Sequence, residues 1–483
     1  MDSVKVLFAA SEAVPFAKTG GLADVAGTLP RELVKLGADV RLIMPKYKSI
    51  PRNFIDAMEY LGYVYVDLSW RQQYCAVLKL EYQGVITYFI DNEYYFNRDG
   101  LYGHFDEAEQ FAFFSKAVLK VLPLIDFKPD IIHCNDWQTG VVSAFLKAGL
   151  GHIGFLNGIK TIYTIHNLKY QGMFPKEILG DILGLSWDYF NSEGLELHDC
   201  VNYMKAGIAY SDIITTVSKT YAEEIKTDFF GENLNGILSK RTEYLYGILN
   251  GIDYEENDPD TDSRIYKNFN AENIEGKYEN KRMLQELLEL PQREEAPVIG
   301  IVSRLVEQKG FDLIAHVLDE LLQMDIQMVV LGTGDINYEE MFNNAAERYP
   351  DKVSANIKYD GVLAQRIYAG SDMFLMPSLY EPCGLSQIFS LRYGTVPIVR
   401  ETGGLKDTVM PYNEYTGEGT GFTFTNYNAH EMLDAVKRAI SCYGQKDIWE
   451  NIVKRGMKQD FSWNKSAKEY LDLYKKLMAM DKS

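Results

Sequence analysis

Residues 4–44 read VKVLFAASEAVPFAKTGGLADVAGTLPRELVKLGADVRLIM, which is an apolar run, a polar loop, a helical stretch and a second apolar run. The first run covers residues 4–10 and the second covers residues 39–44. Between them, three leucines recur at helical spacing before a closing glycine (Leu29, Leu33, Leu36 and Gly37). Because Glu12 and Lys18 interrupt the apolar start so early, a buried strand is favoured over a signal peptide. Strand, helix and strand in this order predict an α/β domain with a parallel sheet.

The same alternation continues along most of the chain. Three further apolar runs in the first half lead into polar residues, at residues 130–133, 161–165 and 213–217. A second series of strands begins after Pro297, at residues 298–302, 328–331, 373–376 and 396–399. Helical stretches accompany these strands, at residues 311–322, 338–349, 364–369 and 386–393. We therefore predict two doubly wound, Rossmann-like α/β domains that face each other across a deep cleft.

The boundaries of these domains follow from a change in pattern. Residues 253–281 are polar, acidic and aperiodic, which is typical of a connection between domains. We predict an N-terminal domain over residues 1–250, a connection over 251–290 and a C-terminal domain over 291–460. The last residues, 461–483, contain an amphipathic helix that is expected to pack back on the N-terminal domain. Its apolar face carries Tyr470, Leu473, Tyr474 and Leu477.

The composition restricts the class of protein. The 483 residues carry 49 Lys and Arg against 68 Asp and Glu, a formal net charge of −19, which argues against binding to nucleic acid or to an anionic membrane. No apolar run approaches the roughly 20 residues of a membrane helix. The five scattered cysteines give no disulfide framework or structural zinc site, so a cytoplasmic location is expected. Aromatic residues reach 13%, with 33 tyrosines, which suits sugar-stacking surfaces, although packing is the commoner use of tyrosine.

A glycine pair lies between the first predicted strand and helix, in Lys18-Thr19-Gly20-Gly21-Leu22-Ala23-Asp24. Glycines let the backbone approach a ligand, the N-terminus of a helix offers free N–H groups, and Lys18 adds a positive charge. Phosphate binding is the functional interpretation, and an ordinary turn from strand to helix is the alternative. The sequence is neither a Walker loop nor a Gly-x-Gly-x-x-Gly fingerprint.

Two loops of the second domain carry charged residues where predicted strands end. Arg304 and Lys309 flank a turn in which two cations could grip a diphosphate, with solvated surface cations as the alternative. In Tyr380-Glu381-Pro382-Cys383-Gly384-Leu385-Ser386, the carboxylate of Glu381 could hold sugar hydroxyls or cap the next helix. Cys383 is favoured as a packing residue, because no partner base is identifiable. Glu401-Thr402-Gly403-Gly404-Leu405 repeats the order of strand, glycine pair and helix.

In the first domain, Asp136 and His166 follow predicted strands and are the natural polar lining of its carboxyl edge. A lone histidine is more often a satisfied core residue than a catalytic one. Neither a His-Glu-x-x-His metal motif nor a Gly-x-Ser-x-Gly nucleophile motif is present.

Eight short elements occur in order along nearly the whole chain: residues 18–24, Asp136-Trp137, Thr164-Ile165-His166-Asn167 with Tyr170-Gln171-Gly172, Asn250-Gly251-Ile252-Asp253, residues 303–310, 381–385 and 402–405, and Phe461-Ser462-Trp463. In this order they resemble the bacterial and plant glycogen and starch synthase family, retaining glycosyltransferases of the two-domain GT-B fold. The resemblance implies transfer of glucose from ADP-glucose to the non-reducing end of an α-1,4-glucan such as glycogen. It also implies that no cofactor and no metal ion are needed, and that the N-terminal domain serves the acceptor and the C-terminal domain the nucleotide sugar.

Residue roles come with this resemblance. It implies that the catalytic residues are Glu381, Arg304, Lys309, His166 and Asp136. It implies substrate binding by Lys18, Gly20, Gly21, Asn250, Tyr359, Cys383, Gly384, Leu385, Thr402, Gly403 and Gly404. In this scheme Lys18, Arg304 and Lys309 meet the donor diphosphate, while Tyr359 lies beside the adenine ring. Glu381 holds the donor glucose, and Asp136 and His166 face the reacting sugar.

Four positions depart from known patterns. Asn233 replaces a family glycine and Asn235 a family acid, and Asn is expected to tolerate the left-handed turn at residue 233. Asn257 stands where the family commonly has a tryptophan. Phe389 occupies the position of a second glutamate found in many other retaining GT-B enzymes, which favours the glycogen synthase branch over sucrose synthases.

Two other functions stay open at this point. One is a related GT-B transferase that uses UDP-glucose or a small acceptor, and the other is a non-catalytic relative that binds glucan or nucleotide sugar. The joint presence of Lys18, Arg304, Lys309 and Glu381 favours an enzyme. The run Asp258-Pro259-Asp260-Thr261-Asp262 has the spacing of a metal-binding Asp-x-Asp motif, but its place in the connection favours a solvated acidic linker.

Overall fold

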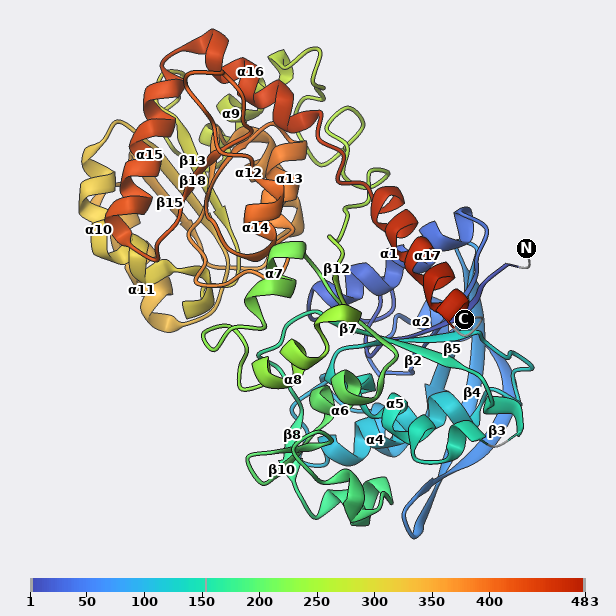
Figure 1. Ribbon diagram of the computed structural model, residues 1–483. Helices are drawn as coiled ribbons and strands as arrows, with labels where there is room; N and C mark the ends of the chain where they lie inside the picture. Colours follow the sequence, from blue (N-terminus) through green and yellow to red (C-terminus); the bar gives the residue numbers. More distant parts are fainter. Residues whose placement is uncertain (1–2, 153, 481–483) are drawn as a thin grey trace. The chain divides into compact units, whose positions relative to one another are not determined.

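A computed structural model describes residues 3–152 and 154–480 of the chain. The chain divides into two compact units, each built around a sheet that is covered by helices (Figure 1). The first unit is formed by the chain up to Val217, by Ala222–Leu249 and by the last helix. The second unit is formed by Ser218–Tyr221 and Asn250–Ser462.

The first unit contains a nine-stranded sheet in the order β12-β11-β7-β6-β1-β2-β5-β4-β3. The strands are β1 (Lys5–Ala9), β2 (Asp39–Pro45), β3 (Glu59–Leu68), β4 (Arg71–Tyr82), β5 (Val85–Asp91), β6 (Ile131–Asn135), β7 (Lys160–Ile165), β11 (Ile213–Thr216) and β12 (Leu245–Gly247). From β12 to β5 all neighbours are parallel, whereas β4 and β3 are antiparallel additions at one edge. The central strand β1 pairs with β2 and β6, so the strand order reverses beside it. Loops diverge at such a point and leave a crevice for ligands.

Helices cover both faces of this sheet. They are α1 (Gly21–Lys35), α2 (Arg52–Asp56), α3 (Glu93–Phe96), α4 (Glu107–Lys120), α5 (Val141–Lys147), α6 (Tyr203–Tyr210), α8 (Asn235–Lys240) and α17 (Trp463–Ala479), with α7 (Lys219–Glu224) where the chain passes between the units. A small antiparallel sheet is formed by β8 (Met173–Pro175), β10 (Cys200–Asn202) and β9 (Glu196–Leu197).

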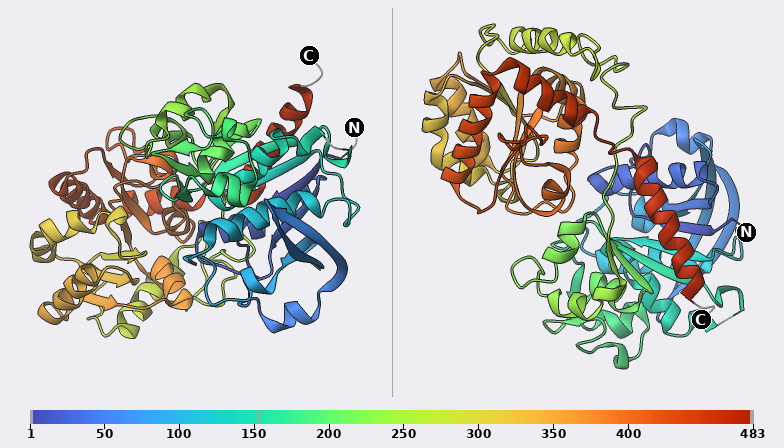
Figure 2. Two further views of the ribbon diagram at one scale, coloured as in Figure 1. Left: turned by 90° about the horizontal axis from the view of Figure 1, so that it is seen from below. Right: turned by 45° about the horizontal axis from the view of Figure 1, so that its top comes forward.

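The C-terminal helix α17 completes the first unit, although it follows the second unit in sequence. It packs against α1, as the right-hand view of Figure 2 shows. The residues predicted for its apolar face are all buried: Tyr470, Leu473, Tyr474 and Leu477. The hydroxyl of Tyr474 lies 2.7 Å from Nδ1 of His133 on β6, which ties the helix to the sheet.

The second unit contains a six-stranded parallel sheet in the order β15-β14-β13-β16-β17-β18. Its strands are β13 (Val298–Val302), β14 (Gln327–Leu331), β15 (Val353–Asn356), β16 (Met373–Met376), β17 (Val396–Arg400) and β18 (Phe422–Phe424). Its helices are α9 (Glu275–Leu287), α10 (Phe311–Gln323), α11 (Ile336–Arg348), α12 (Gly361–Gly370), α13 (Ser386–Arg392), α14 (Gly403–Thr408), α15 (Ala429–Tyr443) and α16 (Lys446–Met457). The predicted doubly wound α/β class is confirmed, and every strand predicted in the two series is present.

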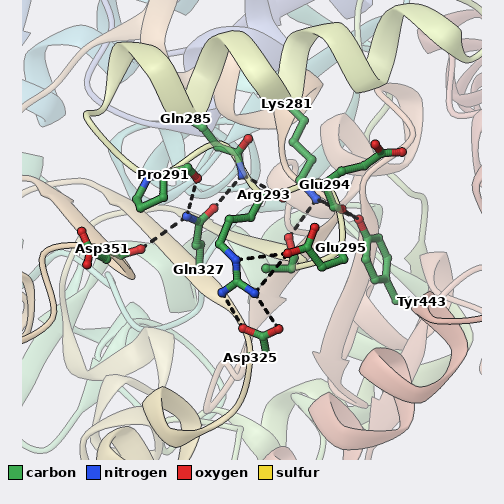
Figure 3. A network of polar contacts seen from close by, with 11 residues as sticks. Lys281, Gln285, Pro291, Arg293, Glu294, Glu295, Asp325, Gln327, Asp351 and Tyr443 are labelled. Atoms are coloured by element: carbon green, nitrogen blue, oxygen red, sulfur yellow. Dashed lines mark hydrogen bonds and ion pairs between the residues drawn. The ribbon is translucent and has the colours of Figure 1, made fainter.

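The prediction of an irregular connection over residues 253–281 is wrong in its last part, because helix α9 begins within it. Lys281 of this helix is buried, and its Nζ lies 2.9 Å from a carboxylate oxygen of Asp372. It also donates to the hydroxyl of Tyr443 at 2.8 Å (Figure 3). The buried face of α9 is therefore largely polar, which conceals the apolar periodicity by which a helix is recognised.

The acidic run at residues 258–262 is solvated only in part: Asp260 and Thr261 are exposed, but the prediction of a solvated linker is wrong for Asp262. Asp262 is only 7% exposed. Its carboxylate accepts hydrogen bonds from Arg264 at 2.7 and 2.9 Å and from the hydroxyl of Tyr393 at 2.5 Å. These partners give Asp262 a structural role within the second unit, because a buried carboxylate needs a cation and donors around it.

Candidate active site

In the first unit, the glycine pair lies at the N-terminus of α1: Gly20 precedes the helix in extended backbone, and Gly21 is its first residue. A Cβ atom added at Gly21 would meet no atom within 4 Å, and one at Gly20 would meet only the carboxylate of Glu12, at 3.5 Å. The protein's own packing therefore does not require glycine at these positions. Lys18 donates to both carboxylate oxygens of Asp24, at 2.7 and 2.8 Å, in a solvent-exposed pair that a stronger anion can break.

Glu12 lies beneath this loop and was missed by the sequence analysis as a site residue. It is 3% exposed, and one carboxylate oxygen accepts hydrogen bonds from the backbone N–H of Thr19 at 2.5 Å and from its hydroxyl at 2.8 Å. Burial raises the pKa of Glu12, while the bonds from Thr19 and from the N–H of Gly20 oppose the rise. The available signal was a charged residue shortly after the apolar strand β1.

Asp136 and His166 follow the neighbouring strands β6 and β7, and the fold brings them together. The backbone N–H of His166 donates to Oδ1 of Asp136 at 2.8 Å. Asp136 adopts a positive φ of 54°, a conformation that is costly for a residue other than glycine and is enriched at functional sites. Burial raises its pKa to about 7, against the effect of the N–H groups of His166 and Asn167.

His166 is neutral and its tautomer is fixed by Asn135. The amide nitrogen of Asn135 donates to the carbonyl of Ala9 at 3.0 Å, which leaves Oδ1 to face Nε2 of His166 at 2.9 Å. Nε2 must therefore carry the proton, and Nδ1 keeps a lone pair that can accept a hydrogen bond. Burial lowers the pKa of His166 to about 3, so the ring does not become a cation near neutral pH.

In the second unit, Lys309 and Glu381 form a close ion pair. Nζ of Lys309 lies 2.5 Å from Oε2 of Glu381, which also accepts from the hydroxyl of Ser378 at 3.2 Å. Glu381 is 6% exposed. The contact arises because β13 and β16 are neighbours, so the loops after these strands meet. Gly310, with φ of 75°, locks the two loops together, since a Cβ there would lie 2.1 Å from the carbonyl oxygen of Pro377.

Arg304 lies on the same loop as Lys309 but is exposed. Within residues 3–152 and 154–480, its guanidinium makes no hydrogen bond and no ion pair. A fork of five N–H donors is thus available to a ligand at the carboxyl end of β13.

The second glycine pair, Gly403-Gly404, consists of glycines for a different physical reason than the first. A Cβ at Gly403 would lie 1.9 Å from the carbonyl oxygen of Glu381, and one at Gly404 would lie 1.9 Å from that of Cys383. The N–H of Gly404 donates to the carbonyl of Glu381 at 3.0 Å. Here glycine is required because two backbone segments of the protein touch. The predicted order of strand, glycine pair and helix is present, and the close backbone contacts of this pair fix the turn that carries Glu381.

The remaining predicted residues fall into two places. Cys383 is buried beside the backbone of Asn250, and burial raises the pKa of its thiol to about 12, which agrees with a packing residue. Oδ1 of Asn250 is buried and finds no hydrogen-bond partner in the described part of the chain. Gly384, Leu385 and Thr402 lie in the same pair of turns, at the starts of α13 and α14. Tyr359 is 89% exposed before α12 and has no ring partner among the described residues.

Known proteins match this chain along its full length. Residues 5–240 match the family described as starch synthase catalytic domain, and residues 287–456 match glycosyl transferases group 1. The chain is 58% identical to the glycogen synthase of Desulforamulus reducens over 475 residues, covering 98% of this chain and 99% of that one. It is 55% identical to the glycogen synthase of Clostridium novyi, with 98% and 99% covered.

The chain belongs to the glycogen and starch synthase family. Its fold matches the catalytic domain of Arabidopsis thaliana starch synthase IV, a structure bound to ADP and acarbose, with a TM-score of 0.91 at 34% identity over 99% of this chain and 100% of that one. A sucrose-phosphate synthase from Thermosynechococcus elongatus, at 16% identity and a TM-score of 0.62, shares the fold alone.

The departures from the family pattern have local explanations. Asn233 has a φ of 65°, so the predicted left-handed turn is present. Asn235 donates to a carboxylate oxygen of Asp228 at 2.6 Å. Asn257 is buried and accepts a hydrogen bond from Gln365 at 3.1 Å. Phe389, at the position of a second glutamate in other enzymes, packs its ring 5.6 Å from that of Tyr368.

Within residues 3–152 and 154–480, no group of three or more His, Cys, Asp or Glu side chains is arranged to hold a metal ion. In the same residues, no helix combines the length and the apolar character that crossing a bilayer requires.

Proposed function

We propose that this chain is a glycogen synthase that transfers the glucosyl group of ADP-glucose to the non-reducing end of an α-1,4-glucan, with retention of configuration. The observation that carries the proposal is the pairing of Lys309 with Glu381 on loops that also present Arg304. Lys309 and Glu381 are 72 residues apart in sequence and meet at the carboxyl ends of β13 and β16, and Arg304 lies on the same loop as Lys309. The family resemblance assigns all three to the donor. That edge of a parallel sheet is where ligands bind.

The second unit is assigned to the donor. The free guanidinium of Arg304 suits the diphosphate, because its planar fork matches phosphate oxygens. Lys309 balances the buried charge of Glu381 and presents a cation to the same group. Negative charge grows on the diphosphate as ADP departs, and fixed cations stabilise that change. The carboxylate of Glu381 accepts hydrogen bonds from hydroxyls of the donor glucose.

The nucleotide contacts complete the donor assignment. Tyr359 offers an exposed ring for the adenine, and the turns that contain Asn250, Cys383–Leu385 and Thr402–Gly404 line the rest. The unsatisfied oxygen of Asn250 supports this, because a buried acceptor without a donor is rare unless a ligand supplies one.

The first unit is assigned to the acceptor, with Lys18 and the N–H of Gly21 contributing to the donor phosphates. The carboxyl group of Asp136 holds a sugar hydroxyl, and Nδ1 of His166 accepts from another. A histidine with a pKa of about 3 is a weak base. We therefore assign the proton of the acceptor hydroxyl to the departing phosphate oxygen, on the face from which ADP leaves.

The test is incorporation of labelled glucose into glycogen from ADP-glucose and, separately, from UDP-glucose, with and without excess EDTA. We expect transfer from ADP-glucose, an α-1,4 linkage in the product, and no effect of EDTA. Transfer only from UDP-glucose would refute the donor assignment. Tight binding of nucleotide and glucan with no transfer from either donor would identify a non-catalytic relative.

A further inference from the structure

Four exposed tyrosines lie together on the antiparallel edge of the first unit. Tyr60, Tyr63 and Tyr65 belong to the edge strand β3, and Tyr74 to its neighbour β4. Their exposed fractions are 56%, 53%, 53% and 44%, so each ring is half available to solvent. We call this set the tyrosine face. It is far from the residues assigned to catalysis in sequence, and nothing in the proposed reaction uses it.

The strand pairing explains why the four side chains share a face. Tyr65 lies directly opposite Tyr74, and Tyr63 lies opposite Ala76, two residues further along β4. Alternate residues of a strand point to the same side, so these three rings lie on one side of the sheet. A bulge between Tyr60 and Gly62 shifts the register of β3 by one residue. That shift adds Tyr60 to the same side, which regular alternation would not do.

The rings are packed against one another rather than scattered. The centroids of Tyr63 and Tyr74 are 5.2 Å apart at an interplanar angle of 32°, and Tyr65 stands nearly perpendicular to Tyr63 at 5.8 Å. The hydroxyl oxygens of Tyr60 and Tyr74 are 3.5 Å apart. Mutual contacts of this kind hold exposed rings in place, so a ligand would lose little side-chain entropy by docking on them.

The surroundings of the tyrosine face are electrically balanced. On the side of the tyrosines, Asp91 lies opposite Ala76 of β4 and 3.1 Å from Lys46, and Asp67 lies 3.1 Å from Lys120. No unpaired charge is left among these flanking residues to attract a polyion. On a chain with net charge −19, nucleic acid and anionic membranes are further disfavoured. Aromatic faces with neutral hydroxyl donors instead suit an uncharged ligand that has both apolar and hydroxyl surfaces.

We propose that the tyrosine face is a second glucan-binding surface, which holds a distal part of the α-1,4-glucan whose end is elongated; this rests on the proposed function. The C–H faces of glucose units stack on the rings, and the phenolic hydroxyls bond to sugar hydroxyls. At about 3.3 Å per residue, the stretch from Tyr60 to Tyr65 spans roughly 16 Å, enough for a chain segment rather than a single sugar. Docking of a second copy through the edge of β3 is disfavoured, because the bulge interrupts regular strand pairing there.

The test compares glycogen binding and catalysis in matched variants. Replacing Tyr63, Tyr65 and Tyr74 together by threonine removes the rings but keeps residues that suit a strand. Replacing the same three by phenylalanine keeps the rings. Tyr415→Thr, at a residue 91% exposed in the second unit, controls for the loss of an exposed tyrosine elsewhere. Affinity is measured by retardation in native gels that contain glycogen, and turnover with a short maltooligosaccharide acceptor.

We expect the threonine variant to lose at least about tenfold in glycogen affinity, or 1.4 kcal/mol, with unchanged turnover on the short acceptor. The phenylalanine variant and Tyr415→Thr should bind glycogen within about threefold of the original chain. Unchanged glycogen affinity in the threonine variant would overturn the proposal. The proposal would also be overturned if light scattering showed the original chain to be a dimer and the threonine variant a monomer, because the tyrosine face would then be a contact between copies. Failure of the original chain to transfer glucose at all would refute the proposed function instead.

Discussion

Replacement of Lys309 by alanine should damage both the stability and the chemistry of the second unit, by separable routes. Glu381 is 6% exposed, and Lys309 is the cation that neutralises it at 2.5 Å. Removing one partner of a buried ion pair typically costs about 3–5 kcal/mol, because the other charge is left without compensation. The side chain of Lys309 is itself 17% exposed, so water can partly replace it, and we expect about 3 kcal/mol. In parallel, loss of one cation at the diphosphate should lower kcat by about 10²–10³.

The double variant Lys309→Ala, Glu381→Gln separates these effects. It removes the uncompensated charge, so the second unit should regain most of the lost stability, whereas kcat should stay low. Stability is read from urea unfolding followed by fluorescence of Trp449, the buried tryptophan of that unit. A double variant as unstable as the single one would refute the pairing argument. A normal kcat in Lys309→Ala would refute the assignment to the diphosphate.

Three further variants test individual contacts. Glu12→Ala leaves two donors of Thr19 without an acceptor, which costs about 1–3 kcal/mol of stability. We expect kcat/KM for ADP-glucose to fall about 10–100-fold in Glu12→Ala and to recover in Glu12→Gln. An equal loss in both variants would contradict a positioning role for Glu12. The pKa of Asp136 is raised to about 7 from 3.8, so ionisation destabilises the fold and stability falls as pH rises through 7. Asp136→Asn should therefore match the original chain near pH 4 in thermal unfolding and exceed it near pH 8; a constant difference would count against this. Asp262→Asn should lower stability by about 1–3 kcal/mol, because its bonds to Arg264 are weakened or lost. The activity of the original chain should stay insensitive to EDTA. Activity that EDTA abolishes and added Mn²⁺ restores would indicate a metal site.

Most strands of the parallel sheets could be predicted from the sequence because each is a short, continuous apolar run with a polar end, whereas β5, β12, β15 and β18 were not predicted. Strand β13, at residues 298–302, is an example. The antiparallel pair β3 and β4 escaped this criterion. Tyr63, Val64 and Tyr65 do not give a clear apolar-polar alternation, and the bulge after Tyr60 shifts what alternation there is. A strand with one exposed face of aromatic residues resembles neither a buried strand nor a polar one.

The types of site residue could be predicted, but not their contacts. Lys309 and Glu381 are 72 residues apart, and only the pairing of β13 with β16 brings them together. Glu12 was missed because it carries no motif of its own, and its role depends on the loop that folds over it. The glycines at 403 and 404 look like those at 20 and 21 in sequence, yet space is open at one pair and filled by backbone at the other. Sequence does not distinguish these cases.

The position of α17 imposes an order on how the protein is made. His133 and Tyr474 are 341 residues apart in sequence, and a ribosome that adds about 5–20 residues per second needs roughly 20–70 s to deliver the second after the first. Throughout that interval the sheet of the first unit lacks the helix that buries part of its apolar surface. The unit that is translated first therefore finishes folding last, after the whole second unit has emerged. A stop codon just before Trp463 would spare the second unit and leave the first without its final helix, so a late truncation should cause its greatest damage in the earliest part of the chain.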